Sequence, residues 1–192
     1  THKNFRSWPP RLTGSSMRPT PRRSSPLEAL IMKTRILLSD RQRSLHLDLL
    51  LIEAACVDLA AEIWGRAVEL SVTLLGRRAM ALANRTHRGY LGATDQISFP
   101  LPADVPTPDG VDLVGDLLLC PSVIAAQCQL DPPDARPRTG SPDRELALVL
   151  CHAFLHLLGH THGEEQDSAL MIREENRLYS KFFSLLDGAF LP

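Results

Sequence analysis

The chain has 192 residues, 44% of them hydrophobic, which is enough to bury the core of one soluble domain. Its net charge is −1, but six basic residues against one acidic residue in segment 1–31 leave −6 for residues 32–192. This mildly acidic body is not typical of a nucleic-acid-binding protein, and no run approaches the roughly 18 apolar residues of a membrane span.

Residues 1–31 are rich in Pro, Ser and Arg and show little apolar periodicity. Such a segment cannot bury enough surface to offset the entropy of ordering, so we expect a disordered basic extension. We favour an upstream translated segment without a role. An organellar targeting segment and a basic arm that touches RNA are the alternatives. The expected folded domain is a single one and spans residues 32–192.

From residue 33 onward, helical and strand periodicities alternate along the chain. In chain order they predict strand 34–39, helix 45–64, strand 68–75, helix 77–86, strand 96–99, strand 111–120, helix 121–130, helix 144–158 and helix 168–186. Strand 96–99 is expected to stop at Pro100, and proline-rich loops are expected over 101–110 and 131–143. Strand 111–120 is mostly apolar, which favours a central position. We therefore expect an α+β fold in which about five helices pack on a small mixed four-stranded sheet.

The four cysteines show no CxxC spacing, and all lie in apolar surroundings: Cys56, Cys120, Cys128 and Cys151. We expect them to be buried free thiols in a reducing compartment. Cys151 precedes His152, but on a helix it points about 100° away from the histidine face and is not expected to bind metal.

The most informative motif is a group of histidines around one glycine. His152 and His156 are four residues apart, so on a helix both imidazoles lie on one face. Gly159 can end that helix in a left-handed conformation and turn the chain back, which brings His162 within reach. If the helix continued through Gly159, His160 would share the face instead. Three neutral imidazoles form the protein half of a tetrahedral zinc site with one open position, as catalytic sites have.

The helix around these histidines is nearly all apolar and is predicted to be buried, which favours a metal over a helix with two unrelated histidines. Zinc is the expected ion, one per chain, held by three histidines and a water, and another divalent transition metal is the alternative. The spacing also matches the extended zinc-protease motif, H-E-x-x-H-x-x-G-x-x-H. Ala153 replaces the glutamate that acts as general base there, so a peptidase is not expected.

Three ordered blocks resemble the YbeY family of ribosomal-RNA maturation endoribonucleases. Residues 151–162 are similar to its H-G-x-L-H-L-x-G-x-D-H, residues 94–100 to T-D-V-L-S-F-P, and residues 115–121 to G-D-I-x-I-C-P. Asn84 and Arg88 fall at the spacing before Thr94 that the family's Asn and Arg occupy. The resemblance covers residues 33–186.

This resemblance implies a zinc-dependent, single-strand-specific endoribonuclease that acts in small-subunit 3′-end rRNA maturation and ribosome quality control. It implies an ion held by His152, His156 and His162, with an rRNA precursor and the small ribosomal subunit as partners. The resemblance also implies a bacterial-type cytoplasmic location. Another three-histidine hydrolase and a non-catalytic ribosome-associated factor are the competing functions.

Two further residues gain an expected role from the resemblance. Arg88 matches the family's functionally important arginine, and a guanidinium can clamp an RNA phosphate and stabilise developing charge. Without the resemblance, it would be read as a plain surface arginine. Ser98 matches the serine of S-F-P, and either binds a phosphate or caps its own loop.

Three residues depart from the family pattern. Thr161 stands where the family has aspartate, which weakens any role of that carboxylate in orienting a ligand or accepting a proton. Ala153 replaces glycine, a mild change in a helix. Gln96 replaces valine in a strand and is expected to face solvent.

Overall fold

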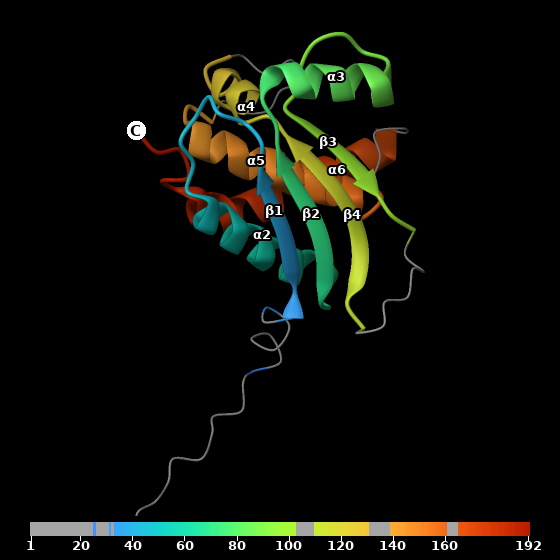
Figure 1. The fold of residues 1–192 in the computed structure, drawn as a ribbon. Coiled ribbons are helices and arrows are strands. Elements are labelled where there is room, and N and C mark those ends of the chain that lie inside the picture. Colours follow the sequence, from blue (N-terminus) through green and yellow to red (C-terminus); the bar gives the residue numbers. More distant parts are fainter. Residues whose placement is uncertain (1–24, 26–30, 32, 103–109, 131–138, 161–164) are drawn as a thin grey trace, which may run out of the picture.

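The computed structural model describes residues 25, 31, 33–102, 110–130, 139–160 and 165–192 (Figure 1). Most of segment 1–31, parts of both proline-rich loops, Thr161 and His162 lie outside these residues. The predicted disorder of the N-terminal segment, its alternatives and the domain boundary at residue 32 therefore stay predictions.

Four strands form one mixed sheet: β1 (Arg35–Asp40), β2 (Val68–Leu74), β3 (Gln96–Pro100) and β4 (Asp112–Leu119). Their order is β1-β2-β4-β3, with β1, β2 and β4 parallel and β3 antiparallel to β4. The interior position expected for β4 is confirmed. Strand β3 runs through Pro100 instead of stopping before it, because an edge strand tolerates a proline that has no N–H to donate.

The helices among the described residues are α2 (Leu49–Trp64), α3 (Arg77–Arg88), α4 (Pro121–Gln127), α5 (Pro142–Leu157) and α6 (Glu165–Phe182), followed by a 3-10 turn, η1 (Phe183–Leu186). The α+β fold with a four-stranded mixed sheet and five helices is thus confirmed. Helix α2 begins later than predicted because the Asp48 carboxylate accepts the amide of Leu51 at 3.0 Å and caps it there. Residue Leu47, before the cap, instead forms an isolated β-bridge with Phe190.

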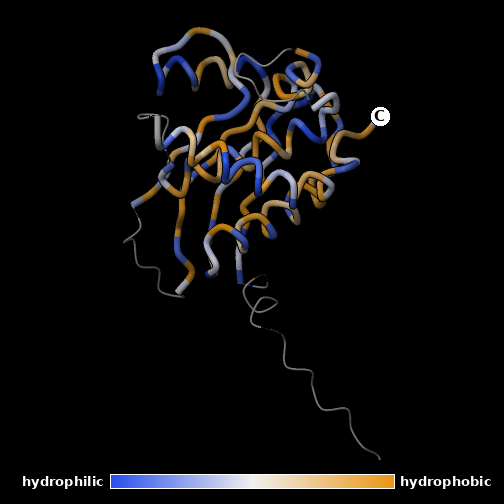
Figure 2. The backbone as a smooth tube through the Cα atoms, turned by 180° about the vertical axis from the view of Figure 1, so that it is seen from behind, coloured by the Kyte–Doolittle hydropathy of each residue, from blue (hydrophilic) through white to orange (hydrophobic). Residues whose placement is uncertain are grey.

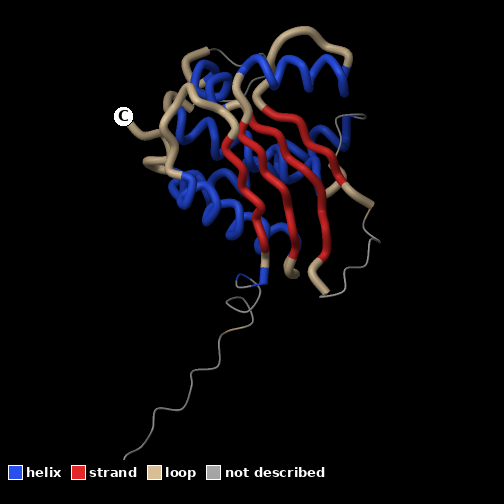
Figure 3. The backbone as a smooth tube through the Cα atoms, in the orientation of Figure 1, coloured by secondary structure: helices blue, strands red, loops and turns tan. Residues whose placement is uncertain are grey.

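Helices α2, α5 and α6 lie on one face of the sheet, and α3 lies across one end of it (Figures 1 and 3). Side chains of β2 alternate accordingly: Val68, Leu70, Val72 and Leu74 are fully buried, and the residues between them are half-buried. In Figure 2, hydrophobic residues run along the strands and the helices packed against them. A second, smaller cluster, Met80, Ile97, Cys120 and Val123, lies between α3, α4 and the sheet.

Helix α5 is deeply buried, with ten buried residues between Leu146 and Leu157. In its second half, residues 151–157, only His152 and His156 are half-buried. The helix is therefore fixed by its apolar neighbours, and the two histidines are the polar positions of this half.

Gly115 determines how closely β3 and α5 approach β4. The ladder between β2 and β4 shifts register here, so that Leu70 pairs with Gly115 while Glu69 pairs with Leu113. Gly115 has φ +144°, and a Cβ on it would collide with the carbonyl oxygen of Phe99 and lie 2.9 Å from a methyl group of Leu157. Only glycine permits this approach.

All four cysteines are buried and free, as expected. Burial raises the pKa of the Cys56 and Cys151 thiols to about 12. No helix within the described ranges is long and apolar enough to cross a membrane.

Candidate metal and RNA site

His152 and His156 meet at one point, as their spacing predicts. Their Nε2 atoms lie 3.0 Å apart, and the rings stand nearly perpendicular, at 84°. Both side chains are half-buried at the carboxyl half of α5.

The other nitrogen of each ring faces an acceptor. Nδ1 of His152 lies 2.6 Å from Oε2 of Glu175, a carboxylate on α6 that is only 2% exposed. Nδ1 of His156 lies 2.9 Å from the carbonyl oxygen of His160. These acceptors favour a proton on both Nδ1 atoms, which in the neutral rings leaves the two Nε2 lone pairs facing each other. Two imidazole nitrogens directed at one point are ligands that zinc prefers, so these two side chains fit a zinc-like ion.

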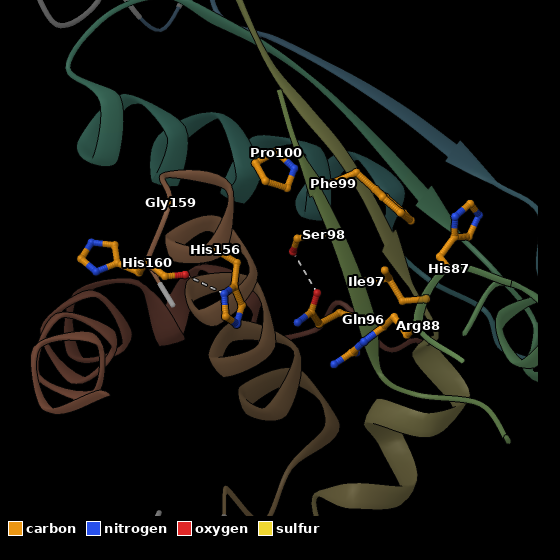
Figure 4. A pocket seen from close by; sticks show the side chains of 10 residues that line it. All are labelled: His87, Arg88, Gln96, Ile97, Ser98, Phe99, Pro100, His156, Gly159 and His160. Carbon is orange, nitrogen blue, oxygen red and sulfur yellow. Dashed lines mark hydrogen bonds between the residues drawn. The ribbon is translucent and has the colours of Figure 1, made fainter. Parts of the chain in front are cut away.

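Helix α5 ends at Leu157, and Gly159 has φ +104°, so the predicted turn is confirmed. The amide of His160 donates to the carbonyl of Leu155 at 3.0 Å, which closes the turn. The His160 imidazole therefore does not continue the histidine face, and Figure 4 shows it pointing away from His156. His162, the predicted third ligand, lies outside the described residues. Within them, no group of three His, Cys, Asp or Glu side chains is arranged for a metal.

A cavity of about 430 Å³ opens beside His156. Its walls come from the end of α3 (His87 and Arg88), from β3 (Gln96–Pro100) and from the end of α5 with its turn (His156, Gly159 and His160) (Figure 4). Of the sequence-predicted residues, Arg88, Ser98 and His156 are thus brought to one pocket, and His152 touches His156 behind it. Its volume lies in the range of ligand-binding pockets, which measure roughly 300–1,000 Å³.

Arg88 is the last residue of α3 and is exposed. Gly89, with φ +76°, ends the helix, and the Arg88 guanidinium lies 5.9 Å from the ring centre of exposed Tyr90. Asn84, which is buried, donates from Nδ2 to the carbonyl of Gly92 at 3.0 Å and so ties the loop after Arg88 to the helix. This hydrogen bond fixes the loop after Arg88 without the help of a ligand.

Ser98 links the edge strand to the metal helix. Its Oγ lies 2.9 Å from Oε1 of Gln96 and 3.2 Å from the carbonyl oxygen of Ala153, one residue after His152. The hydroxyl has a single hydrogen, so it donates to one of these acceptors at a time. Neither contact is the cap of its own loop that the sequence suggested for Ser98.

The expectation that Gln96 faces solvent is wrong, because it is 8% exposed and lines the cavity. Side chains alternate along β3, so Gln96 lies on the same side of the strand as Ser98, toward α5. Ile97 and Phe99 lie on the other side, where the Phe99 ring meets the His87 ring edge-on at 5.0 Å.

Glu175 and His87 were also not identified from the sequence. A signal existed for Glu175: it lies on the apolar face of α6, with Met171 four residues before it and Leu178 three residues after it. An acid in such a row needs a buried partner. His87 precedes Arg88 directly and offers no comparable signal.

The fold and the pocket define an α+β protein with paired histidines on a buried helix beside a strand and an arginine. A family model described as Endoribonuclease YbeY matches residues 39–183, and the chain belongs to this family. It is 30% identical over 148 residues to the Endoribonuclease YbeY of Alkaliphilus metalliredigens, covering 75% of this chain and 92% of that one. It is 36% identical over 110 residues to that of Cutibacterium acnes, covering 55% and 66%.

The fold also resembles the solution structure of TM1509 from Thermotoga maritima. The TM-score is 0.50 at 22% sequence identity, over 78% of this chain and 89% of that one. This likeness supports the fold.

Proposed function

We propose that this protein is a zinc-dependent endoribonuclease specific for single-stranded RNA. We further propose that it acts on rRNA precursors, in maturation of the 3′ end of the small-subunit RNA and in ribosome quality control. One observation carries the proposal: the Nε2 atoms of His152 and His156 face each other, and His156 lines a pocket together with Arg88. The names of the YbeY relatives support an endoribonuclease activity, and a cytoplasmic site of action accompanies the proposal.

His152 and His156 would hold the ion together with His162. When bound, the ion supplies a Lewis acid for a phosphoryl oxygen or an activated water. Glu175 and the His160 carbonyl keep the two described imidazoles in the tautomer and orientation that a ligand needs.

Arg88 would bind the phosphodiester and stabilise the negative charge that grows on it during cleavage. The helix that carries it, α3, contains four arginines and no acidic residue, in a chain whose net charge is −1. One of the four, Arg77, donates to the carbonyl of Ser122 at 2.8 Å and is structural. Arg78, Arg85 and Arg88 are exposed and provide a local positive potential for RNA.

The test is cleavage of end-labelled single-stranded RNA by the purified full chain and by its His156→Ala variant, with zinc content measured on both. We expect one ion per native chain, cleavage that a chelator abolishes, no cleavage of the duplex, and loss of activity in the variant. A native chain that holds one ion and does not cut RNA would contradict the proposal. That result would favour another three-histidine hydrolase or a non-catalytic ribosome-associated factor.

The ribosomal target needs a separate measurement. In cells that lack the protein, we expect small-subunit RNA with an unprocessed 3′ end to accumulate, and expression of the native chain to remove it. A mature 3′ end in such cells would exclude this target and leave the nuclease activity untouched.

A further inference from the structure

Gln96 is a buried amide on an edge strand, in a position where a strand residue usually presents an apolar side chain. Its Oε1 accepts the hydroxyl of Ser98 at 2.9 Å, and its backbone N–H donates to the carboxylate of Asp95 at 2.8 Å. Burying an amide is costly unless its polar atoms find partners. The side chain therefore has a reason to be there other than packing.

The amide nitrogen of Gln96 is directed into the pocket. Gln96, Arg88 and His156 all line the same cavity. Figure 4 shows the amide nitrogen of Gln96 turned toward His156, while the amide oxygen accepts a hydrogen bond from the Ser98 hydroxyl. An amide nitrogen offers two N–H donors and a guanidinium five. The wall formed by Gln96 and Arg88 is thus rich in donors and matches an acceptor-rich, anionic ligand.

The ribose-phosphate backbone of RNA is such a ligand, because each nucleotide presents phosphate oxygens and a 2′-hydroxyl. We infer that Gln96 is a substrate-contacting residue whose amide donates a hydrogen bond to the RNA backbone held by Arg88. This inference rests on the proposed function and adds a second donor to the same pocket.

The sequence pattern of the family supplies a matched control. The block T-D-V-L-S-F-P has valine where this chain has Gln96, and valine is well suited to a strand. A Gln96→Val variant should fold, yet it can neither donate to RNA nor accept the Ser98 hydroxyl. Thr73→Val, a polar-to-valine change on β2 outside the cavity, serves as the control for an effect on the sheet alone.

Cleavage kinetics of single-stranded RNA and thermal unfolding would be measured for the native chain and both variants. We expect Gln96→Val to raise KM about 3- to 10-fold with little change in kcat, as the loss of one hydrogen bond does. Thr73→Val should match the native chain. Gln96→Glu should raise KM further, since it replaces a donor with a negative charge beside phosphate. Equal KM values for the native chain and Gln96→Val would overturn the inference.

Gln96 could act only by holding Ser98, and a double variant separates the two roles. If Gln96 contacts RNA directly, Gln96→Val raises KM in a Ser98→Ala background as well. If it acts only through Ser98, the change is silent in that background, and the inference is overturned.

The acceptor on RNA is identified by binding of labelled single-stranded RNA and of the DNA of the same sequence. Weaker binding of both by Gln96→Val indicates a phosphate oxygen, and weaker binding of RNA alone indicates the 2′-hydroxyl. A native chain that neither cuts nor binds RNA would overturn the proposed function together with this inference. A native chain that cuts RNA while Gln96→Val equals it would overturn this inference alone.

Discussion

The carboxylate of Glu175 lies 2.6 Å from Nδ1 of His152, and the two residues come from different helices, α6 and α5. A carboxylate in this position fixes the imidazole ring and makes its other nitrogen a better ligand. The pairing of α5 with α6 is thus part of the proposed metal site.

Glu175→Gln should weaken zinc binding about 10- to 100-fold, because the amide holds the imidazole less strongly than the carboxylate. Competition with a chromophoric chelator would measure the affinity, and circular dichroism would check that the variant folds. Glu174→Gln, the same change at a neighbour whose carboxylate pairs with Arg177 on the surface, should bind zinc normally. Equal affinities in the two variants would refute the role of Glu175.

Arg88→Lys should lower kcat/KM for single-stranded RNA by about 10- to 100-fold, since lysine keeps the charge but cannot donate two parallel hydrogen bonds. Arg78→Lys alters an exposed arginine of the same helix that does not line the cavity, and should have little effect. Little loss in Arg88→Lys would mean that Arg88 acts through its charge alone, and a loss of similar size in both variants would mean that Arg88 has no special role on α3.

Gly115→Ala should destabilise the fold by about 2–4 kcal/mol, because the new methyl group collides with the Phe99 carbonyl and crowds Leu157. Gly65→Ala is the comparison: Gly65 also has positive φ, +58°, but has open space around it. That change should cost only about 1–2 kcal/mol of backbone strain. Urea unfolding of both variants gives the two values, and a smaller loss at Gly115 would contradict the packing argument.

Cys56 and Cys151 should resist alkylation in the native protein. With a pKa of about 12, only about one molecule in ten thousand carries the thiolate at pH 8, and the thiols are buried besides. Mass spectrometry after treatment with iodoacetamide should find both unmodified in the folded chain and modified in urea. Rapid labelling of either thiol without urea would show that the core opens there.

Glu62 joins α2 to α6 through Lys181 at 2.7 Å and Arg177 at 2.8 Å. The hydrogen bonds from Lys181 and then Arg177 lower the pKa of this carboxyl from its ordinary 4.5. A lowered pKa means that the stabilisation is complete above pH 4.5 and is lost as the pH falls through the lowered value. The partners are about half exposed, so the contribution is at most about 1 kcal/mol.

The stability difference between the native chain and Glu62→Gln should therefore be largest near neutral pH and shrink below pH 4.5. It should also shrink in high salt. Urea unfolding across that pH range would measure it. A difference that does not change with pH would show that the ion pairs do not contribute.

Local periodicity was enough to predict the histidine pair and the turn at Gly159, because both depend on the geometry of one helix. The contact of Glu175 with His152 could not be predicted, because the two residues are 23 positions apart and meet only when α6 packs on α5. The expected exposure of Gln96 is wrong because a short strand in the sequence does not tell which of its two sides a helix will cover.

The two walls of the pocket both pack against the same residue of β4, Gly115. Strand β3, which carries Gln96 and Ser98, and the end of α5, which carries His156, both approach β4 where Gly115 has no side chain. Glycine at position 115 therefore lets the two walls lie as close together as they do. Substitutions among the lining residues would alter the chemistry of the pocket, whereas a side chain at position 115 would alter the distance between its walls.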